Sequence, residues 1–196
     1  IGIGNTEFSY KRLLVAPETL KEGILGYIDR EIAKAKEGGA GRIAMKMNSL
    51  TDKTVIDKLV EASCAGVRVR LLVRGICCLR PGVEGKTENI TVTSVVGRFL
   101  EHSRIYTFGE GEDRVTYISS ADMMTRNTDK RVEIAAPLLD KAVEEQVCSY
   151  LELMLSDNVK AMHLCEDGVY RPAVRAEGEK EINGQEECIR LAQKLQ

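Results

Sequence analysis

Apolar positions in the first part of the chain alternate between helical and strand spacing. Leu20, Ile24 and Ile28 recur four residues apart, which predicts a helix, and Gly38 supplies its C-terminal cap. β-Branched and other apolar runs before and after it are typical of strands. The expected elements are a strand before Pro17, a helix over 18–37, a strand over 42–48, a helix over 52–64 and a strand over 67–73. This alternation predicts parallel strands joined by right-handed crossovers.

The second half of the chain predicts further strands and two more helices. An acidic, Gly-containing stretch over 109–113 predicts a hairpin turn, which adds antiparallel strands to the parallel ones. The expected elements are strands over 90–96, 105–108, 114–119, 132–136 and 162–165, and helices over 140–155 and 179–196. We therefore expect a mixed sheet flanked by helices, in a single α/β domain over 11–196. Residues 1–10 are interpreted as a linker from an upstream domain that this chain lacks.

Charge is unevenly distributed along the chain. The net charge is −2, which argues against a general nucleic-acid-binding protein. Residues 42–131 nevertheless carry 15 Lys and Arg against 11 Asp and Glu, whereas the remainder carries 13 against 19. Basic charge is concentrated in the middle of the chain, which suits a local site for a polyanion.

The cysteines and the hydropathy pattern bear on location. The six cysteines form no Cys-x-x-Cys pair, so we interpret them as reduced, buried hydrophobes rather than as zinc ligands or disulfides. No apolar run approaches the roughly 18 residues that a membrane span requires. We expect a cytoplasmic protein, either free or associated with a membrane. Because the chain begins with Ile1 rather than Met, we also expect it to be a piece of a longer protein.

One of the two histidines lies in a basic, polar stretch. His102 has Arg98 and Arg104 as near neighbours, and small hydroxyl and charged residues follow between Ser119 and Glu133. Arg offers a planar set of donors to phosphoryl oxygens, and His can relay a proton or carry a phosphoryl group. The alternative is an exposed loop with ordinary surface charge. His102 is the only candidate for acid–base or nucleophilic work, and Glu133 could orient it as a carboxylate partner.

The ends of the predicted parallel strands offer further candidates. Ligands in open α/β sheets bind at the carboxyl ends of parallel strands. Arg74 follows one such strand and precedes Gly75, so it can reach the crevice, although a surface Arg at a strand end is the alternative. Lys46 and Asn48 end the preceding strand and are weaker candidates. His163 lies within a short apolar strand and is interpreted as structural.

Several of these residues form motifs that resemble known ones. His102-Ser-Arg104 followed by Ser119-Ser120-Ala-Asp122 resembles half of a phospholipase-D-like site, with Arg in place of the usual Lys and Asp122 where Asn is usual. More specifically, the chain resembles the last domain of bacterial polyphosphate kinase over nearly its whole length. The stretches that carry this resemblance include LLVAP at 13–17, KMNSLTD at 46–52, LLVRGICCLRPG at 71–82, VGRFLEHSRI at 96–105, SSAD at 119–122 and DGVY at 167–170.

The resemblance implies a fold and a reaction. It implies a phospholipase-D-like mixed sheet flanked by helices. Members of the family move the terminal phosphoryl group of ATP onto polyphosphate, reversibly and with Mg²⁺, through a phosphohistidine in the domain that precedes this one. This chain would be the C-terminal catalytic half, inactive alone, with the Mg²⁺ ligands in the missing upstream domain. Its ligands would be ATP or ADP and inorganic polyphosphate, not nucleic acid, and we expect the full-length protein to be a homo-oligomer.

The resemblance also implies roles for individual residues. Arg74 matches an Arg that contacts the nucleotide, and His102 matches the second active-site His of the family. Glu133 and Arg131 match charged residues of the same site, and Arg104 joins the expected ATP- and phosphate-binding set. No metal ligand is expected within this chain.

Two departures from the family pattern concern packing near the site. Gly97 stands where an acidic residue is common, and Met123-Met124 stand where an aromatic residue followed by Met is expected. Two other functions stay open: a stand-alone polyanion-binding module and a phospholipase-D-like phosphodiesterase. The second needs two His-x-Lys halves, so a dimer would have to supply the other half, and Arg104 in place of Lys counts against it.

Overall fold

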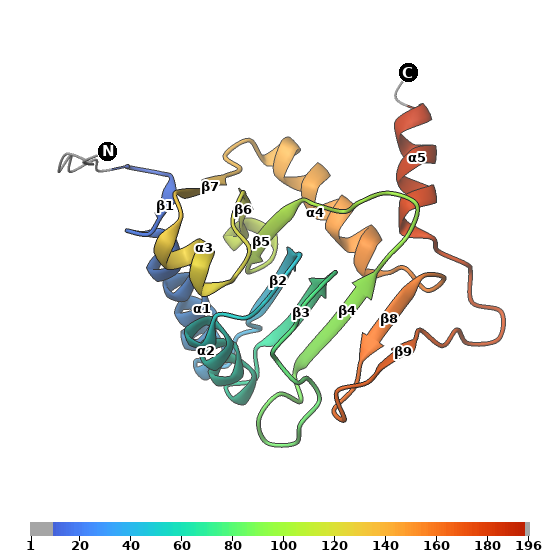
Figure 1. The fold of residues 1–196 in the computed structure, drawn as a ribbon, viewed down its shortest axis with the longest axis horizontal. Helices are drawn as coiled ribbons and strands as arrows, with labels where there is room; N and C mark the ends of the chain where they lie inside the picture. The colour runs from blue at the N-terminus through green and yellow to red at the C-terminus, as the bar shows by residue number, and fades with distance from the viewer. Residues whose placement is uncertain (1–9, 195–196) are drawn as a thin grey trace.

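The computed structural model describes residues 10–194 and arranges them around one nine-stranded sheet (Figure 1). The strand order is β1-β7-β6-β5-β2-β3-β4-β8-β9, and the sheet contains both parallel and antiparallel pairs, as the sequence predicts. All but the last residue of the expected linker over 1–10 lies outside the described residues. The elements are β1 (Leu14–Ala16), α1 (Leu20–Lys36), β2 (Arg42–Met47), α2 (Lys53–Cys64), β3 (Arg68–Val73), β4 (Ile90–Val95), β5 (Arg104–Phe108), the 3₁₀ turn η1 (Gly111–Asp113), β6 (Val115–Ser119), α3 (Thr125–Lys130), β7 (Glu133–Pro137), α4 (Lys141–Leu155), β8 (Ala161–Leu164), β9 (Tyr170–Pro172) and α5 (Gly184–Lys194).

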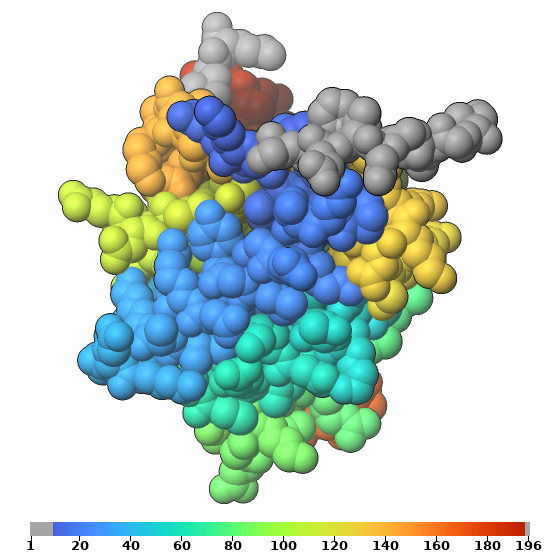
Figure 2. All heavy atoms as spheres, turned by 90° about the vertical axis from the view of Figure 1, so that its left-hand side faces the viewer, coloured from blue at the N-terminus to red at the C-terminus, as the bar shows by residue number. Residues whose placement is uncertain are grey.

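Helices cover both faces of the sheet. α1 and α2 lie side by side on one face, where Leu20 and Leu59 belong to the same buried cluster as Leu71 of β3 (Figures 1 and 2). α4 covers the other face, where Met154 packs with Leu72. Because side chains alternate along a strand, Leu71 and Leu72 point to opposite faces, and both are buried.

Several strand ends meet at one edge of the sheet, which we call the carboxyl edge. The parallel strands β2, β3 and β4 end there at Met47, Val73 and Val95. β5 runs antiparallel to β2, so its first residue, Arg104, lies at the same edge and pairs with Ser119 at the end of β6. β7 runs antiparallel to β6 and begins at this edge as well.

Backbone hydrogen bonds join the loops at the carboxyl edge. Leu50, in the loop after β2, donates its N–H to the carbonyl of Ile76 at 2.8 Å and accepts from the N–H of Cys78 at 2.9 Å. The N–H of Thr51 donates to the carbonyl of Met123 at 2.8 Å. The loops after β2, β3 and β6 are therefore held in one frame.

Some elements in the second half of the chain differ from the sequence-based expectation. β9 forms a hairpin with β8, and α3 occupies a stretch for which no helix is predicted. α5 begins at Gly184 rather than at residue 179, because the Asn158 side chain hydrogen-bonds the carbonyl of Lys180 and the N–H of Ile182. These bonds hold the preceding segment in a non-helical conformation.

The cysteines are only partly as expected. All six are free, and Cys148 is buried, but Cys64 and Cys78 are exposed, so the expectation of burial is wrong for these two. Cys64 ends α2, and its Sγ lies against the carbonyls of Gly85 and Lys86 instead of in the core. Within residues 10–194, none of the helices combines the length and the apolar character that crossing a membrane requires.

Candidate active site

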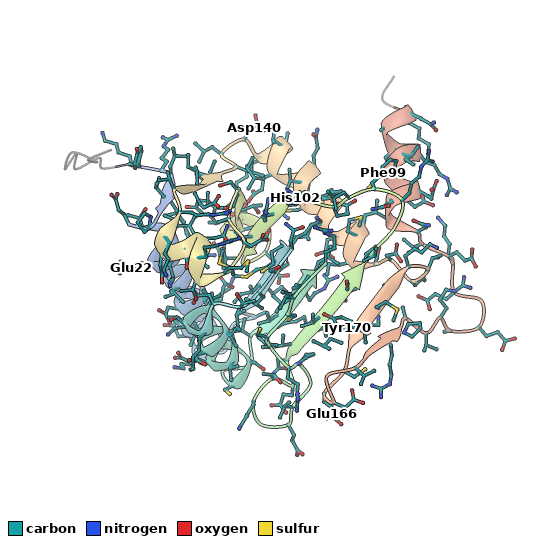
Figure 3. The ribbon with its side chains drawn as sticks, viewed as in Figure 1. Glu22, Phe99, His102, Asp140, Glu166 and Tyr170 are labelled. Atoms are coloured by element: carbon teal, nitrogen blue, oxygen red, sulfur yellow. The ribbon has the colours of Figure 1, made fainter. Side chains whose placement is uncertain are left out.

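The candidate residues gather at the carboxyl edge. His102 lies on the connection between β4 and β5, beyond the ends of the parallel strands (Figure 3). Arg104 begins β5, Arg74 directly follows β3, Asp122 lies in the loop after β6, and Glu133 begins β7. The fold therefore brings to one edge residues that are distant in the sequence.

The buried carboxylate of Asp122 and the half-buried guanidinium of Arg104 form an ion pair at this edge. Arg104 Nη2 lies 2.9 Å from Asp122 Oδ2, and Nε lies 3.2 Å from Oδ1. Asp122 Oδ1 also accepts from the backbone N–H groups of Asn48 at 2.6 Å and Ser49 at 3.3 Å. Burial alone raises the pKa of this carboxyl group, but the hydrogen bonds from Arg104 and Asn48 outweigh it and hold the pKa below its ordinary value. Asp122 thereby ties the end of β2 to the start of β5.

The same arginine fixes the ring of His102. Arg104 Nη1 lies 3.1 Å from His102 Nδ1 and 3.1 Å from the His102 carbonyl oxygen. A guanidinium carries donors and no acceptor, so Nδ1 is the acceptor in this bond and the proton of the neutral ring lies on Nε2. Because the residue is exposed, this Nε2–H is available to a ligand as a hydrogen-bond donor.

Arg74 and Arg104 differ in what they leave for a ligand. The guanidinium of Arg104 is engaged with Asp122 and His102, whereas Arg74 uses only Nε, which donates to Asn48 Oδ1 at 3.1 Å. Among the residues that the structure describes, the two Nη groups of Arg74 have no hydrogen-bond partner. Nη donors in this fixed fork suit phosphoryl oxygens, which they can bind in pairs.

Lys46 is buried beneath the segment that carries His102. Its residue is 3% exposed, its Nζ lies 3.3 Å from Glu101 Oε2, and it donates to the carbonyl of Ser103 at 3.2 Å. Burial lowers the pKa of Lys46, and the attraction of Glu101 offsets only part of that effect. The Lys46 ammonium group is therefore already occupied by partners on both sides of His102.

Glu133 lies at the carboxyl edge without contacting His102. Its carboxylate accepts hydrogen bonds from Ser120 Oγ and, at 2.8 Å, from Asn127 Nδ2, whereas the His102 ring is bonded to the neighbouring guanidinium. The direct pairing of Glu133 with His102 that the sequence suggests is therefore wrong. Arg131 is exposed at the C-terminal end of α3, two residues before Glu133.

Two residues near His102 have no local signal in the sequence. Tyr150 of α4 and Gln185 of α5 both donate to the carboxylate of Glu101, the residue that precedes His102. Glu101 also pairs with Lys46. Helical periodicity identifies the helices that carry Tyr150 and Gln185, but only the tertiary fold brings them to this edge.

The described residues do not form a metal site of their own. Within residues 10–194, no three His, Cys, Asp or Glu side chains gather closely enough to hold a metal ion. Three carboxylates at the carboxyl edge, Asp122, Glu133 and Glu101, are engaged with protein groups. No ligands for the Mg²⁺ that the resemblance implies are assigned among residues 10–194.

The fold defines the class of domain. A mixed sheet between helical layers is the architecture of a phospholipase-D-like α/β domain. The crystal structure of a phospholipase D family member from Salmonella typhimurium matches with a TM-score of 0.52 and 16% identity, over 72% of this chain and 90% of that one, which shows a likeness of fold alone. The chain belongs to the family described as polyphosphate kinase C-terminal domain 2, which matches residues 13–185.

Relatives in several bacteria carry the same domain. A polyphosphate kinase from Staphylococcus saprophyticus is 56% identical over 161 residues, 82% of this chain and 22% of the relative. One from Bacillus cereus is 48% identical over 187 residues, 95% of this chain and 26% of the relative. The crystal structure of polyphosphate kinase from Porphyromonas gingivalis matches with a TM-score of 0.91 and 40% identity, over 95% of this chain and 28% of that one. The chain therefore spans about a quarter of the length of the relatives it matches.

Proposed function

We propose that this chain is the C-terminal catalytic half of an ATP:polyphosphate phosphotransferase. The complete protein would move the terminal phosphoryl group of ATP to polyphosphate and back, through a phosphohistidine in a preceding domain. Mg²⁺ would be held by ligands outside the described residues and would neutralise phosphate charge. Membership of the polyphosphate kinase family supports the reaction, and the carboxyl edge supports a role in it.

The observation that carries the proposal is the bond between Arg104 and His102. In this bond Arg104 Nη1 donates to His102 Nδ1, which leaves the proton of the neutral ring on Nε2. A ring in this state can donate to a phosphoryl or leaving-group oxygen but presents no unprotonated nitrogen to attack phosphorus. His102 therefore suits a hydrogen-bond donor to a developing oxyanion better than a nucleophile, which supports a phosphohistidine located elsewhere.

Arg74 would supply the charge that phosphoryl transfer needs. Such reactions require little covalent work from the protein, but they require negative charge to be neutralised and the reacting groups to be aligned. The Nη groups of Arg74 would contact phosphate oxygens of the nucleotide, and the buried ammonium group of Lys46 would add positive potential from below. In this proposal Arg131, at the end of α3, would add positive charge to the site. Glu133 would fix the start of β7 at the carboxyl edge through its bonds to Ser120 and Asn127.

The bond between Arg104 and His102 also weighs on the phosphodiesterase alternative. A phospholipase-D-like nucleophile needs an unprotonated ring nitrogen aimed at phosphorus, and Arg104 occupies one nitrogen while the other carries the proton. This geometry favours the phosphotransferase over that alternative.

The proposal is tested in the full-length gene product that contains this chain. We expect His102→Ala to lower ATP-dependent polyphosphate synthesis by roughly 10²-fold or more, the usual loss when a hydrogen-bond donor to a developing oxyanion is removed, while acid-labile phosphate still forms on the protein. His163→Ala, which removes the exposed histidine on β8, serves as the matched control and should retain synthesis. If the phosphoenzyme also disappears in His102→Ala, then His102 helps to form it, and the proposed division between domains is wrong.

A further inference from the structure

The segment that carries His102 has little apolar burial of its own. Residues 96–103 connect β4 to β5 without regular structure, and Val96, Phe99 and Leu100 are 67%, 48% and 72% exposed. Holding a residue in one backbone conformation carries an entropic cost that other contacts must offset. Contacts from outside the segment must therefore fix the position of His102.

Gln185 makes the most complete of these contacts. Its Oε1 accepts from the backbone N–H of Phe99 at 2.9 Å, and its Nε2 donates to the carbonyl of Phe99 at 2.9 Å and to Glu101 Oε1 at 3.1 Å. Gln185 is 4% exposed, so these bonds are protected from water. One amide side chain thus engages both backbone groups of one residue and the carboxylate next to His102.

Gly97 provides the space that Gln185 occupies. A Cβ at position 97 would lie 2.5 Å from Gln185 Oε1 and 3.0 Å from its Cδ, closer than atoms normally approach. The backbone of Gly97 is not in the left-handed region, so the missing side chain, not an unusual φ, is what matters here. The absence of a side chain at Gly97 therefore leaves the space that the Gln185 amide occupies.

Glu101 connects the same contact to the floor of the site. Its Oε2 accepts from Tyr150 of α4 and pairs with Lys46 of β2 at 3.3 Å, while its Oε1 accepts from Gln185 of α5. Lys46 also donates to the carbonyl of Ser103 at 3.2 Å. The residues immediately before and after His102 are therefore both bonded to one buried ammonium group.

The start of α5 is itself anchored, so Gln185 has a fixed base. The N–H of Gly184 donates to Asp157 Oδ2 at 2.8 Å, just beyond the end of α4. A Cβ at Gly184 would lie 3.0 Å from Met154 Sδ, so this first residue of α5 packs tightly against α4. In Figure 3, the loop bearing Phe99 passes beside α5 and leads to His102.

We propose that Gln185 is a positioning residue for the phosphoryl-transfer step, acting on His102 through Phe99 and Glu101. This inference rests on the proposed function and assigns α5 a part in it. Gln185 does not touch substrate. It holds the 96–103 segment so that His102 Nε2–H meets the transferring or leaving oxygen, and misplacement of a reacting group by about 1 Å can cost roughly 10²-fold in rate.

The test uses the full-length gene product and three substitutions. Gln185→Ala removes all three hydrogen bonds, and Gly97→Ala displaces Gln185 from the opposite side. Gln193→Ala changes the same residue type at an exposed position of α5 and is the matched control. We expect the first two to lower kcat for polyphosphate synthesis about tenfold to hundredfold, with KM for ATP changed less than about threefold because Arg74 is untouched.

Two further readouts separate positioning from a general structural defect. Phosphoenzyme formation from ATP should be retained in both variants, and the amide of Phe99 should exchange hydrogen faster than in the parent. If either variant folds and keeps the parental kcat, Gln185 is not a positioning residue. If the parent itself makes no polyphosphate, the proposed function fails instead, so the two failures are distinguishable.

Discussion

At the scale of single residues, the site depends on how each arginine is used. The guanidinium of Arg104 is bonded to Asp122 and His102, whereas the Nη groups of Arg74 have no hydrogen-bond partner among the described residues and can bind a ligand. Sequence position identifies both as candidates, because both lie at strand ends on the carboxyl edge. It does not distinguish them, because the partner that engages Arg104 is 18 residues away in the sequence.

Arg74→Ala should weaken nucleotide binding more than Lys46→Ala. Loss of a charge-assisted hydrogen bond costs about 1.5–3 kcal/mol, or roughly tenfold to hundredfold in Kd. Lys46 contributes only through the field of a buried charge that is already paired with Glu101. Calorimetric titration of ATP into the two variants of the full-length gene product measures this. Equal Kd values would exclude Arg74 from the nucleotide site.

Asp122→Asn should lower stability in a pH-dependent way. The folded pKa of Asp122 is depressed below the unfolded value of about 4. Its contribution is therefore present above about pH 4 and is lost as pH falls through the folded pKa. We expect the variant to lose roughly 1.5–3 kcal/mol of unfolding free energy at pH 7, as for lost hydrogen bonds to a charged group, and the difference from the parent to shrink in acid.

Chemical denaturation at pH 7 and below pH 4 measures the Asp122 effect. Asp167→Asn removes an exposed carboxylate that pairs with Arg171, and it should leave the unfolding free energy close to that of the parent at pH 7. A difference between Asp122→Asn and the parent that is independent of pH would mean that the lost charge is not the cause.

At the scale of elements, periodicity predicts most helices and strands but not how they end or pair. The run of Leu20, Ile24 and Ile28 is long enough to identify α1. β9 has three residues, too few to show alternation, and the start of α5 is set by bonds from Asn158. Local patterns contain neither piece of information, because the partners lie in other elements.

The candidate site shows the same division. His102 and Arg74 are recognisable because charged residues at the ends of parallel strands are expected to face a ligand. The roles of Gln185 and Tyr150 are not, because a Gln or Tyr on a helix has no feature that marks it until the helix is docked. The expectation of a Glu133–His102 pair fails for the same reason, since only the fold shows that Ser120 and Asn127 donate to the Glu133 carboxylate.

At the scale of the whole molecule, the proposed function gives this chain one wall of the site and places the nucleophile in another domain. Its described residues offer no metal cluster, and Arg104 leaves His102 in a donor state. We therefore predict that the isolated chain makes no polyphosphate from ATP and Mg²⁺, although it binds polyphosphate with an affinity that falls as ionic strength rises.

Synthesis assays on the isolated chain, with the full-length gene product as the positive control, test this prediction. Binding is measured in the same preparation at low and high salt, which shows that the isolated chain is folded. Robust synthesis by the isolated chain would place the nucleophile within it and overturn the prediction.

The backbone bonds among the loops at the carboxyl edge have a consequence for how such a domain can vary. Leu50, Ile76, Cys78 and Met123 meet through N–H and carbonyl groups, which every residue other than proline possesses. The exposed side chains of Ile76 and Cys78 can therefore change while the distance between the Arg74 loop and the Asp122 loop is preserved, whereas Leu50 and Met123 are also constrained by burial in the core. The number of residues in each loop cannot change so freely, because one insertion would break the pairing. Across related chains, loop length at this edge is expected to be better preserved than residue identity.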